Sequence, residues 1–159
     1  IEGNTGTSVI PTIFGNSKLF DFDSQSFTNI DYSVISKADL LILDEVSRLD
    51  QAIQTVLQDF LSAGGSVLLV PSATPDLESY RTLLPGLSKS TQSKTLALSK
   101  LDNKNPFFEN VFQEAPNQMA MPEVRNSIEW GTDRQAILKQ QDDKPYLSQF
   151  SSAGKLYVL

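Results

Sequence analysis

Two apolar segments decide the fold. Residues 40–46 read LLILDEV, and residues 64–71 read GGSVLLVP. Residues 40–43 form a continuous apolar run, and residues 66–70 form a second one. Runs of this length without polar alternation are typical of strands that are buried on both faces of a parallel sheet. The two segments therefore predict two neighbouring strands at the centre of an α/β domain.

The segment between these strands predicts a helix. Its apolar residues recur at helical spacing and form one stripe facing the sheet: Leu49, Ile53, Val56, Leu57, Phe60 and Leu61. Ser47, with Asp50 three residues later, resembles a capping box at the start of the helix. Gly64 and Gly65 supply a left-handed stop at its end. A strand, a helix and a strand with short joints predict a right-handed crossover and parallel pairing.

Weaker patterns flank this unit. Thr74 as cap and Pro75 at the first helical position predict a second helix that ends at residues 84–86. Residues 9–14 are interpreted as a short helix. Further strands are predicted, with differing strength of pattern, at residues 1–4, 19–27, 95–101 and 155–159 and in a β-hairpin over 136–150 with its turn at 142–145.

Composition limits the classes of function. The chain has 159 residues, of which 40% are hydrophobic and 20% charged, as in one soluble globular domain spanning 1–159. Asp and Glu number 19 against 13 Lys and Arg, for a net charge of −6. This balance disfavours nucleic acid and anionic membrane as partners. The sequence opens on IEGN without an initiator Met, so we interpret it as truncated at both ends from a longer protein.

The chain contains no Cys and no His. It therefore has no thiolate nucleophile, no disulfide and neither of the commonest ligands of zinc. Mechanisms that pair Ser or Cys with a His base are excluded within this chain. We accordingly expect no enzyme activity, no cofactor and no metal site.

Two nucleotide- or phosphate-dependent alternatives share parts of the pattern. Asp44-Glu45 with Ser72-Ala73-Thr74 would suit a helicase core, but residues 3–8 lack the Lys of a GxxxxGK[ST] phosphate loop. Asp44, Ser72 and Lys144-Pro145 have the order found in a phospho-receiver domain, but the Lys comes too late for short crossovers. We interpret both likenesses as accidents of α/β architecture.

Any ligand site is expected beyond the carboxyl ends of the two central strands, where open α/β sheets bind ligands. The candidate ligand-binding residues are Asp44, Glu45, Ser72 and Thr74. Adjacent residues of a strand point to opposite faces, so Asp44 and Glu45 are not expected to act as a carboxylate pair on one substrate.

Aromatic residues offer a second kind of surface. The cluster Phe107-Phe108-Val111-Phe112 and the lone Trp130 are expected in the core, since a Phe cluster at helical spacing usually packs inward. The loop over 113–125, which carries Met119 and Met121, is the expected exposed partner surface.

One family resemblance covers nearly the whole chain. Its motifs are IDY at 30–32, ADLLIL at 38–43, GGSVLLVP at 64–71, NPFFENVF at 105–112 and KPYLSQFSSAGKLYV at 144–158. The chain resembles the class I glutamine-amidotransferase-like domain, close to the ThuA-like branch. It is similar to the version in large bacterial membrane proteins that carry an N-terminal aerotolerance-regulator (BatA-type) double-transmembrane domain.

The resemblance implies a flavodoxin-like three-layer α/β/α sandwich with a mainly parallel sheet and a C-terminal β-hairpin. Amidotransferases use a Cys nucleophile and a His-Glu pair, and this chain lacks Cys and His, so their catalytic residues have no counterpart here. Where ThuA-like relatives tend to have a His after the second strand, this chain has Pro71.

The combined expectation is a non-catalytic domain that acts in protein interaction or assembly. The resemblance places it on the periplasmic side of the inner membrane, in a membrane-anchored envelope protein, with a protein partner and no direct membrane contact of this segment. The alternative is a degenerate ThuA-like domain that binds or processes a small carbohydrate-like ligand around Asp44 and Ser72.

Overall fold

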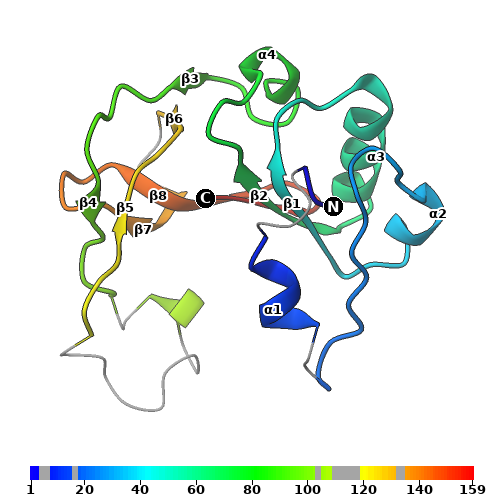
Figure 1. The fold of residues 1–159 in the computed structure, drawn as a ribbon, viewed down its shortest axis with the longest axis horizontal. Coiled ribbons are helices and arrows are strands. Elements are labelled where there is room, and N and C mark those ends of the chain that lie inside the picture. The colour runs from blue at the N-terminus through cyan, green and yellow to red at the C-terminus, as the bar shows by residue number, and fades with distance from the viewer. Residues whose placement is uncertain (4–7, 16–17, 103–104, 109–118, 132–134) are drawn as a thin grey trace.

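The computed structural model describes residues 1–3, 8–15, 18–102, 105–108, 119–131 and 135–159. Its centre is a five-stranded sheet with the order β1-β2-β9-β8-β7 (Figure 1). The strands are β1 (Leu40–Val46), β2 (Ser66–Pro71), β7 (Ala136–Lys139), β8 (Pro145–Ser151) and β9 (Lys155–Val158). β1, β2 and β9 are parallel, β8 is antiparallel to β9, and β7 is antiparallel to β8. The chain is thus an α/β protein with a mixed sheet, and the predicted parallel pairing and hairpin are confirmed.

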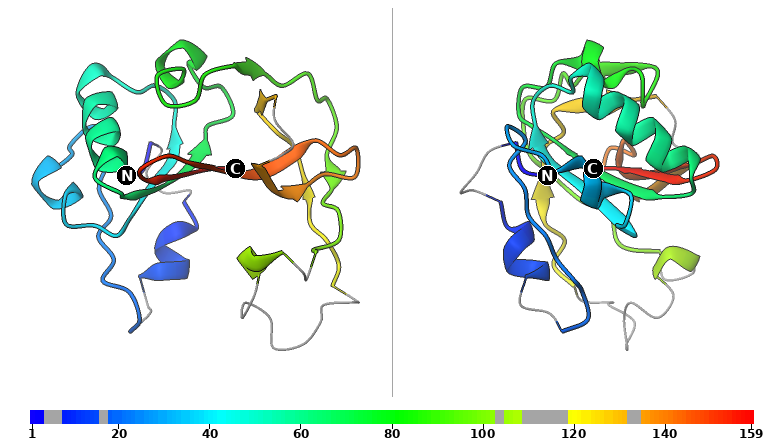
Figure 2. Two further views of the ribbon diagram at one scale, coloured as in Figure 1. Left: turned by 180° about the vertical axis from the view of Figure 1, so that it is seen from behind. Right: turned by 90° about the vertical axis from the view of Figure 1, so that its right-hand side faces the viewer.

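The remaining elements are short apart from one helix. The helices are α1 (Ile10–Phe14), α2 (Tyr32–Ile35), α3 (Gln51–Ser62), α4 (Leu77–Tyr80) and the 3-10 turn η1 (Pro106–Phe108). Two small antiparallel sheets pair β3 (Leu87–Lys89) with β6 (Ile128–Trp130) and β4 (Leu96–Ala97) with β5 (Glu123–Val124). The helices α3 and α4 lie on one side of the large sheet, and α1 lies on the other (Figure 2).

The core fills the side of the sheet that faces α3. Alternate residues of β1, β2 and β9 are buried there: Leu41, Leu43, Val67, Leu69, Leu156 and Val158. They form one cluster with Ile53, Leu57 and Phe60 of α3. The opposite face is less covered, since Ile42, Leu68 and Tyr157, which align across the strands, are only half-buried. Leu40 is 43% exposed, so the prediction that this run is buried on both faces is wrong at its first residue.

The structure corrects the predicted start of both helices. The side chain of Asp50, and not that of Ser47, caps α3 by accepting a hydrogen bond from the amide of Ile53 at 2.9 Å. The second helix begins after Asp76, and α4 has only four residues. Its late start has a local cause, because the amide of Asp76 donates to the carbonyl of Ser47 at 2.7 Å. This bond holds residues 74–76 against the β1–α3 loop and prevents Thr74 from acting as the cap.

The end of α3 follows the prediction. Gly64 has φ of +95°, the left-handed conformation that stops a helix and favours glycine. The amide of Gly65 then donates to the carbonyl of Phe60 at 2.9 Å. The chain is thereby turned directly into β2.

Before β1, the short helix is confirmed but the strand over 19–27 is wrong. Among the described residues, the segment makes only an isolated parallel bridge, between Ser26 and Glu2. Its apolar residues do not alternate toward a core, since Leu19 is 87% and Phe20 55% exposed. Glu2 also forms a parallel bridge with Asp44, which places residues 1–3 beside β1, while Asn4 of the predicted strand lies outside the described residues.

After α4, the prediction for Trp130 is confirmed, and those for the 95–101 strand and for Phe107 are corrected. Trp130 is 4% exposed and lies in the core as expected. The strand predicted over 95–101 is reduced to the two residues of β4 and a bridge from Leu98 to Gln140. Phe107 is 40% exposed, so a core position is wrong for this ring, which contacts Phe108 and Tyr157 instead. Val111 and Phe112 lie outside the described residues.

Candidate functional site

The two carboxylates at the end of β1 lie in different surroundings. Asp44 is 8% exposed, and its backbone bonds to residues 1–3, with its amide donating to the Ile1 carbonyl and its carbonyl accepting from Gly3. Glu45 is exposed and has φ of +53°, in a bulge between Asp44 and Val46. The bulge turns Glu45 outward, so the two side chains do not converge, as expected.

Ser72 and Thr74 follow the end of β2, next to the end of β1. The hydroxyl of Ser72 is buried and has no hydrogen-bond partner among the described residues. Thr74 is exposed. The fold thus brings Asp44 and Ser72 to the same end of the sheet, but within the described part of the chain no hydrogen bond joins any two of the four predicted residues.

A hollow of about 380 Å³ does lie beyond the carboxyl ends, at the starts of α3 and α4. We call it the carboxyl-end crevice. It is lined by Arg48, Leu49, Asp50, Gln51, Gln54, Asp76, Glu78 and Ser79. A hollow thus lies at the expected location, but Asp44, Glu45, Ser72 and Thr74 are not among its lining residues, and ligand binding there stays a prediction. The sequence does not mark these residues as the lining of a crevice, because polar residues at helix starts normally act as caps.

Hydrogen bonds hold the walls of this crevice together. The Ser79 hydroxyl accepts from the Leu49 amide at 3.0 Å and donates to the Asp76 carbonyl at 2.7 Å. The Gln54 amide donates to the carbonyls of Leu49 and Ser79 at 2.9 and 3.1 Å. Arg48 reaches across the rim, with its Nε 3.6 Å from Asp76 Oδ2. The crevice is a polar, internally bonded concavity of mixed charge.

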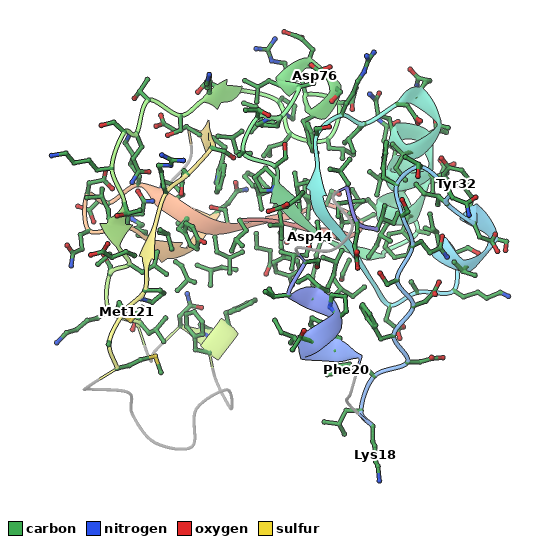
Figure 3. The ribbon with its side chains drawn as sticks, in the orientation of Figure 1. Lys18, Phe20, Tyr32, Asp44, Asp76 and Met121 are labelled. Atoms are coloured by element: carbon green, nitrogen blue, oxygen red, sulfur yellow. The ribbon has the colours of Figure 1, made fainter. Side chains whose placement is uncertain are left out.

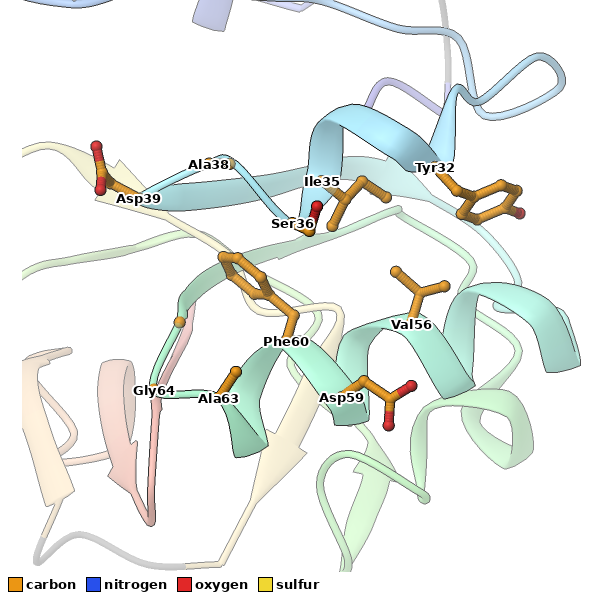
Figure 4. Close-up of a pocket in the computed structure, with 11 residues that line it drawn as sticks. Tyr32, Ile35, Ser36, Ala38, Asp39, Val56, Asp59, Phe60, Ala63 and Gly64 are labelled. Carbon is orange, nitrogen blue, oxygen red and sulfur yellow. The ribbon is translucent and has the colours of Figure 1, made fainter.

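A larger hollow of about 570 Å³ lies between α2 and the second half of α3 (Figure 4). It borders the residues just before β1 and β2, at the end of the strands opposite the crevice. We call it the amino-end groove. Its walls include Tyr32, Ile35, Asp39, Val56, Asp59 and Phe60. Sequence reasoning missed this groove, because Ile35, Val56 and Phe60 have the pattern of ordinary core residues.

A third feature is a set of exposed apolar side chains on α1 and the segment after it. We call residues 9–15 and 18–22 the aromatic lobe, of which Phe20 and Lys18 are labelled in Figure 3. Val9, Ile13 and Leu19 are 64%, 59% and 87% exposed. The ring of Phe14 meets Phe20 edge-on at 5.2 Å and stacks on Phe22 at 6.2 Å. The three rings thus contact one another, and none of the α1 residues is buried.

The predicted partner loop is described only in part, since 113–118 lie outside the described residues. Met119 is 45% exposed, whereas Met121 is half-buried and Glu123–Val124 form β5. Its role as a partner surface stays a prediction.

Several ionisable groups have shifted pKa values, and their contacts are structural. The Lys144 ammonium bonds to Glu129 Oε1 at 2.9 Å and lowers the pKa of that carboxyl. Burial raises the pKa of the Tyr80 phenol, whose hydroxyl donates to the Val46 carbonyl. Each of these contacts fastens one element to another. Glu129 and Tyr80, whose pKa values are shifted, line neither the crevice nor the groove.

Within the described residues, no cluster of three or more His, Cys, Asp or Glu side chains is placed to hold a metal ion. In the same part of the chain, no helix has the length and apolar character needed to cross a bilayer. No protein-family model and no curated protein matches the sequence.

Proposed function

We propose that this chain is a non-catalytic amidotransferase-like domain that acts in protein interaction or assembly within a larger envelope protein. In this proposal the fold is a flavodoxin-like three-layer sandwich. The parallel set β1-β2-β9, with α3 as a crossover on one face and α1 on the other, supports it. The lack of Cys and His in the sequence supports the non-catalytic part. A periplasmic position rests on the family resemblance alone.

The observation that carries the interaction role is the aromatic lobe. Val9, Ile13, Leu19 and Phe20 expose between 55% and 87% of their side chains. Apolar side chains gathered on a surface commonly mark the contact with another protein. They also cost stability in water, at roughly 25 cal/mol for each Å² of apolar surface left uncovered. A partner that covers the lobe would recover this free energy.

A photo-crosslinking experiment in cells tests this role. A benzoyl-phenylalanine at position 20 replaces one exposed aromatic ring by another, and the same residue at Gln58, exposed on α3, is the matched control. We expect one discrete crosslinked protein band from position 20 and none from position 58. Equal, diffuse crosslinking from both positions, or none from either, contradicts the proposal.

The carboxyl-end crevice favours a second candidate function, the binding of a small carbohydrate-like ligand. Its carboxylates, amide and guanidinium have the planar polar groups that pair with neighbouring hydroxyls. A ligand that binds only the folded state raises the melting temperature. We therefore expect a neutral sugar to raise the melting temperature of the wild type and not of Arg48→Ala, whose side chain is 76% exposed. If no sugar raises the melting temperature of the wild type, this candidate function is wrong.

A further inference from the structure

The amino-end groove has a preformed apolar wall. Ile35 and Phe60 are 3% and 9% exposed and belong to the core cluster. The Phe60 ring lies against the backbone of Gly65, where a Cβ atom would lie 2.4 Å from the ring. A side chain at position 65 would therefore push the ring aside. The glycine lets the ring close one end of the groove in a fixed orientation.

An exposed aromatic ring stands beside this wall. Tyr32 at the start of α2 is 39% exposed, and its ring extends over the side of α3 that carries Val56 (Figure 4). Tyr32 and half-buried Val56 line the same groove, so it contains both an aromatic and an aliphatic side chain. Such a pair suits a long side chain with an apolar stem and a charged end.

The charge of the groove is negative. Asp39 and Asp59 are both exposed on its rim, and no Lys or Arg is among its lining residues. Asp59 also lies in the last turn of α3, which contains no basic residue. A carboxylate at that end of a helix adds to the negative end of the macrodipole, an arrangement that destabilises the helix itself. The groove therefore attracts cations.

Lys37 is the basic residue nearest to Asp39 along the chain. Lys37 is two residues from Asp39, but its charge contributes to lowering the pKa of Asp31, after the larger effect of the Ser33 hydrogen bonds. Asp31 caps α2 and does not line the groove. Among the described residues, neither Asp39 nor Asp59 forms a salt bridge, so both carboxylates are available to a cation that comes from outside the chain.

We propose that the amino-end groove binds a basic segment of a partner protein. In this proposal, basic side chains of that segment face the separate carboxylates of Asp39 and Asp59 on the rim, and one aliphatic stem lies on Val56 with its cation at the Tyr32 ring. Small-molecule pockets enclose most of their ligand, whereas this groove lies open between two helices. The inference rests on the interaction role proposed above and adds the chemistry of one partner surface.

Fluorescence anisotropy with defined peptides tests the inference. The probe is a labelled penta-arginine amide, and penta-glutamate of equal length and the polyamine spermidine are competitors. The groove variant is Asp39→Asn with Asp59→Asn. The matched control is Asp21→Asn with Asp143→Asn, which changes the net charge equally at exposed positions of the aromatic lobe and the β7–β8 turn. Asn suits position 143, whose φ is +66°.

We expect the groove variant to bind penta-arginine at least tenfold more weakly than the wild type, and the control to stay within about twofold. Tyr32→Leu should weaken binding about threefold to tenfold, because Leu keeps the apolar contact and loses the aromatic face. Spermidine should compete poorly, and penta-glutamate should not compete.

Three outcomes overturn the inference. Equal loss in the groove variant and the control would mean unspecific attraction to an acidic protein. Spermidine that binds as tightly as the peptide would mean a site for a small cation. Absence of binding would mean no site of this kind. Crosslinking at position 20 is independent of all three, so the interaction role can survive when this inference fails.

Discussion

Asp50 shows how one side chain sets the start of the longest described helix. Its carboxylate accepts the amide hydrogen of Ile53 at 2.9 Å, while Ser47 lies exposed three residues earlier. In the sequence, Ser47 and Asp50 fit one capping box. The apolar stripe begins at Leu49, between them, and so does not show which of the two is the cap. The choice depends on the path of the β1–α3 loop, which is bonded to residue 76. Local sequence does not contain that contact.

We predict that Asp50→Ala lowers the free energy of unfolding by about 1 kcal/mol, the usual cost of losing an N-cap. Asp50→Asn should restore most of it, since an Asn oxygen can accept the same bond. Urea denaturation at neutral pH measures the difference. Ser47→Ala is the control and should change stability by less than about 0.5 kcal/mol. A larger effect at Ser47 than at Asp50 would show that the cap is misassigned.

Glu45 marks the limit of prediction at the scale of one residue. Its φ of +53° is uncommon for a residue with a Cβ atom, and nothing in LLILDEV indicates it. The cause lies outside the strand. Gly3 packs so closely that a Cβ there would lie 2.3 Å from the Glu45 carbonyl oxygen. The bulge thus accommodates a segment more than forty residues away in the sequence.

At the scale of elements, polar contacts fasten β6 to the hairpin of β7 and β8. Trp130 Nε1 donates to the Ser148 hydroxyl at 2.8 Å, and Lys144 bonds to Glu129 Oε1 at 2.9 Å. Ser148 is fully buried, whereas the Glu129 and Lys144 side chains are 30% and 40% exposed. The first contact is shielded from water, and the second is open to solvent and therefore responds to pH.

The ion pair predicts a pH-dependent contribution to stability. Because the folded state lowers the pKa of Glu129, the pair stabilises the protein fully above the unfolded pKa, about 4.3. This contribution is lost as the pH falls from there through the folded pKa. We expect Glu129→Gln to cost up to about 1 kcal/mol at pH 7, as for other surface pairs, and little at pH 3. Urea denaturation between pH 7 and pH 3 measures both.

Lys144→Gln provides the matched background for that experiment. Without the ammonium, Glu129→Gln should have a much smaller effect at pH 7, because the partner that lowers the carboxyl pKa is gone. An unchanged effect in that background would mean that Glu129 acts through the Ser90 hydroxyl, which donates to the same oxygen at 3.0 Å.

The elements that could be predicted are those with a strong pattern of their own. The long stripe of α3 and the continuous runs of β1 and β2 are examples, and the hairpin was indicated by its turn. The elements that were missed or misjudged are short. β3, β4, β5 and β6 have two or three residues each, and they exist because a neighbouring segment pairs with them. The 19–27 segment had some alternation, but within the described part of the chain it pairs only with Glu2.

At the scale of the whole molecule, one core joins α3 to the small β3–β6 sheet. The cluster that contains Ile53 and Leu57 of α3 also contains Leu87 of β3 and Ile128 and Trp130 of β6. We therefore predict a single cooperative unfolding transition. Fluorescence of Trp130, the lone Trp, follows β6, while far-UV circular dichroism follows mainly α3. Their urea midpoints should coincide, and two separated midpoints would contradict one domain over 1–159.

The sequence indicated where a crevice lies, but it did not indicate which residues line it. The rule for open α/β sheets pointed to the carboxyl ends of β1 and β2, and a polar crevice lies there. Its walls come from the first turns of α3 and α4 instead of the strand ends, because the bulge turns Glu45 outward and Asp44 is buried. The amino-end groove had no rule to indicate it.

The place of β9 has a consequence for biosynthesis. β9 lies in the middle of the large sheet, yet it follows the other four strands along the chain. On the ribosome, β1 and β2 can pair early, but the β7–β8 hairpin cannot join them until residues 155–158 emerge. Until then β2 and β8 each present an unpaired edge. A stop codon just before Lys155 would therefore release a chain with two separate half-sheets, a product prone to aggregation and proteolysis.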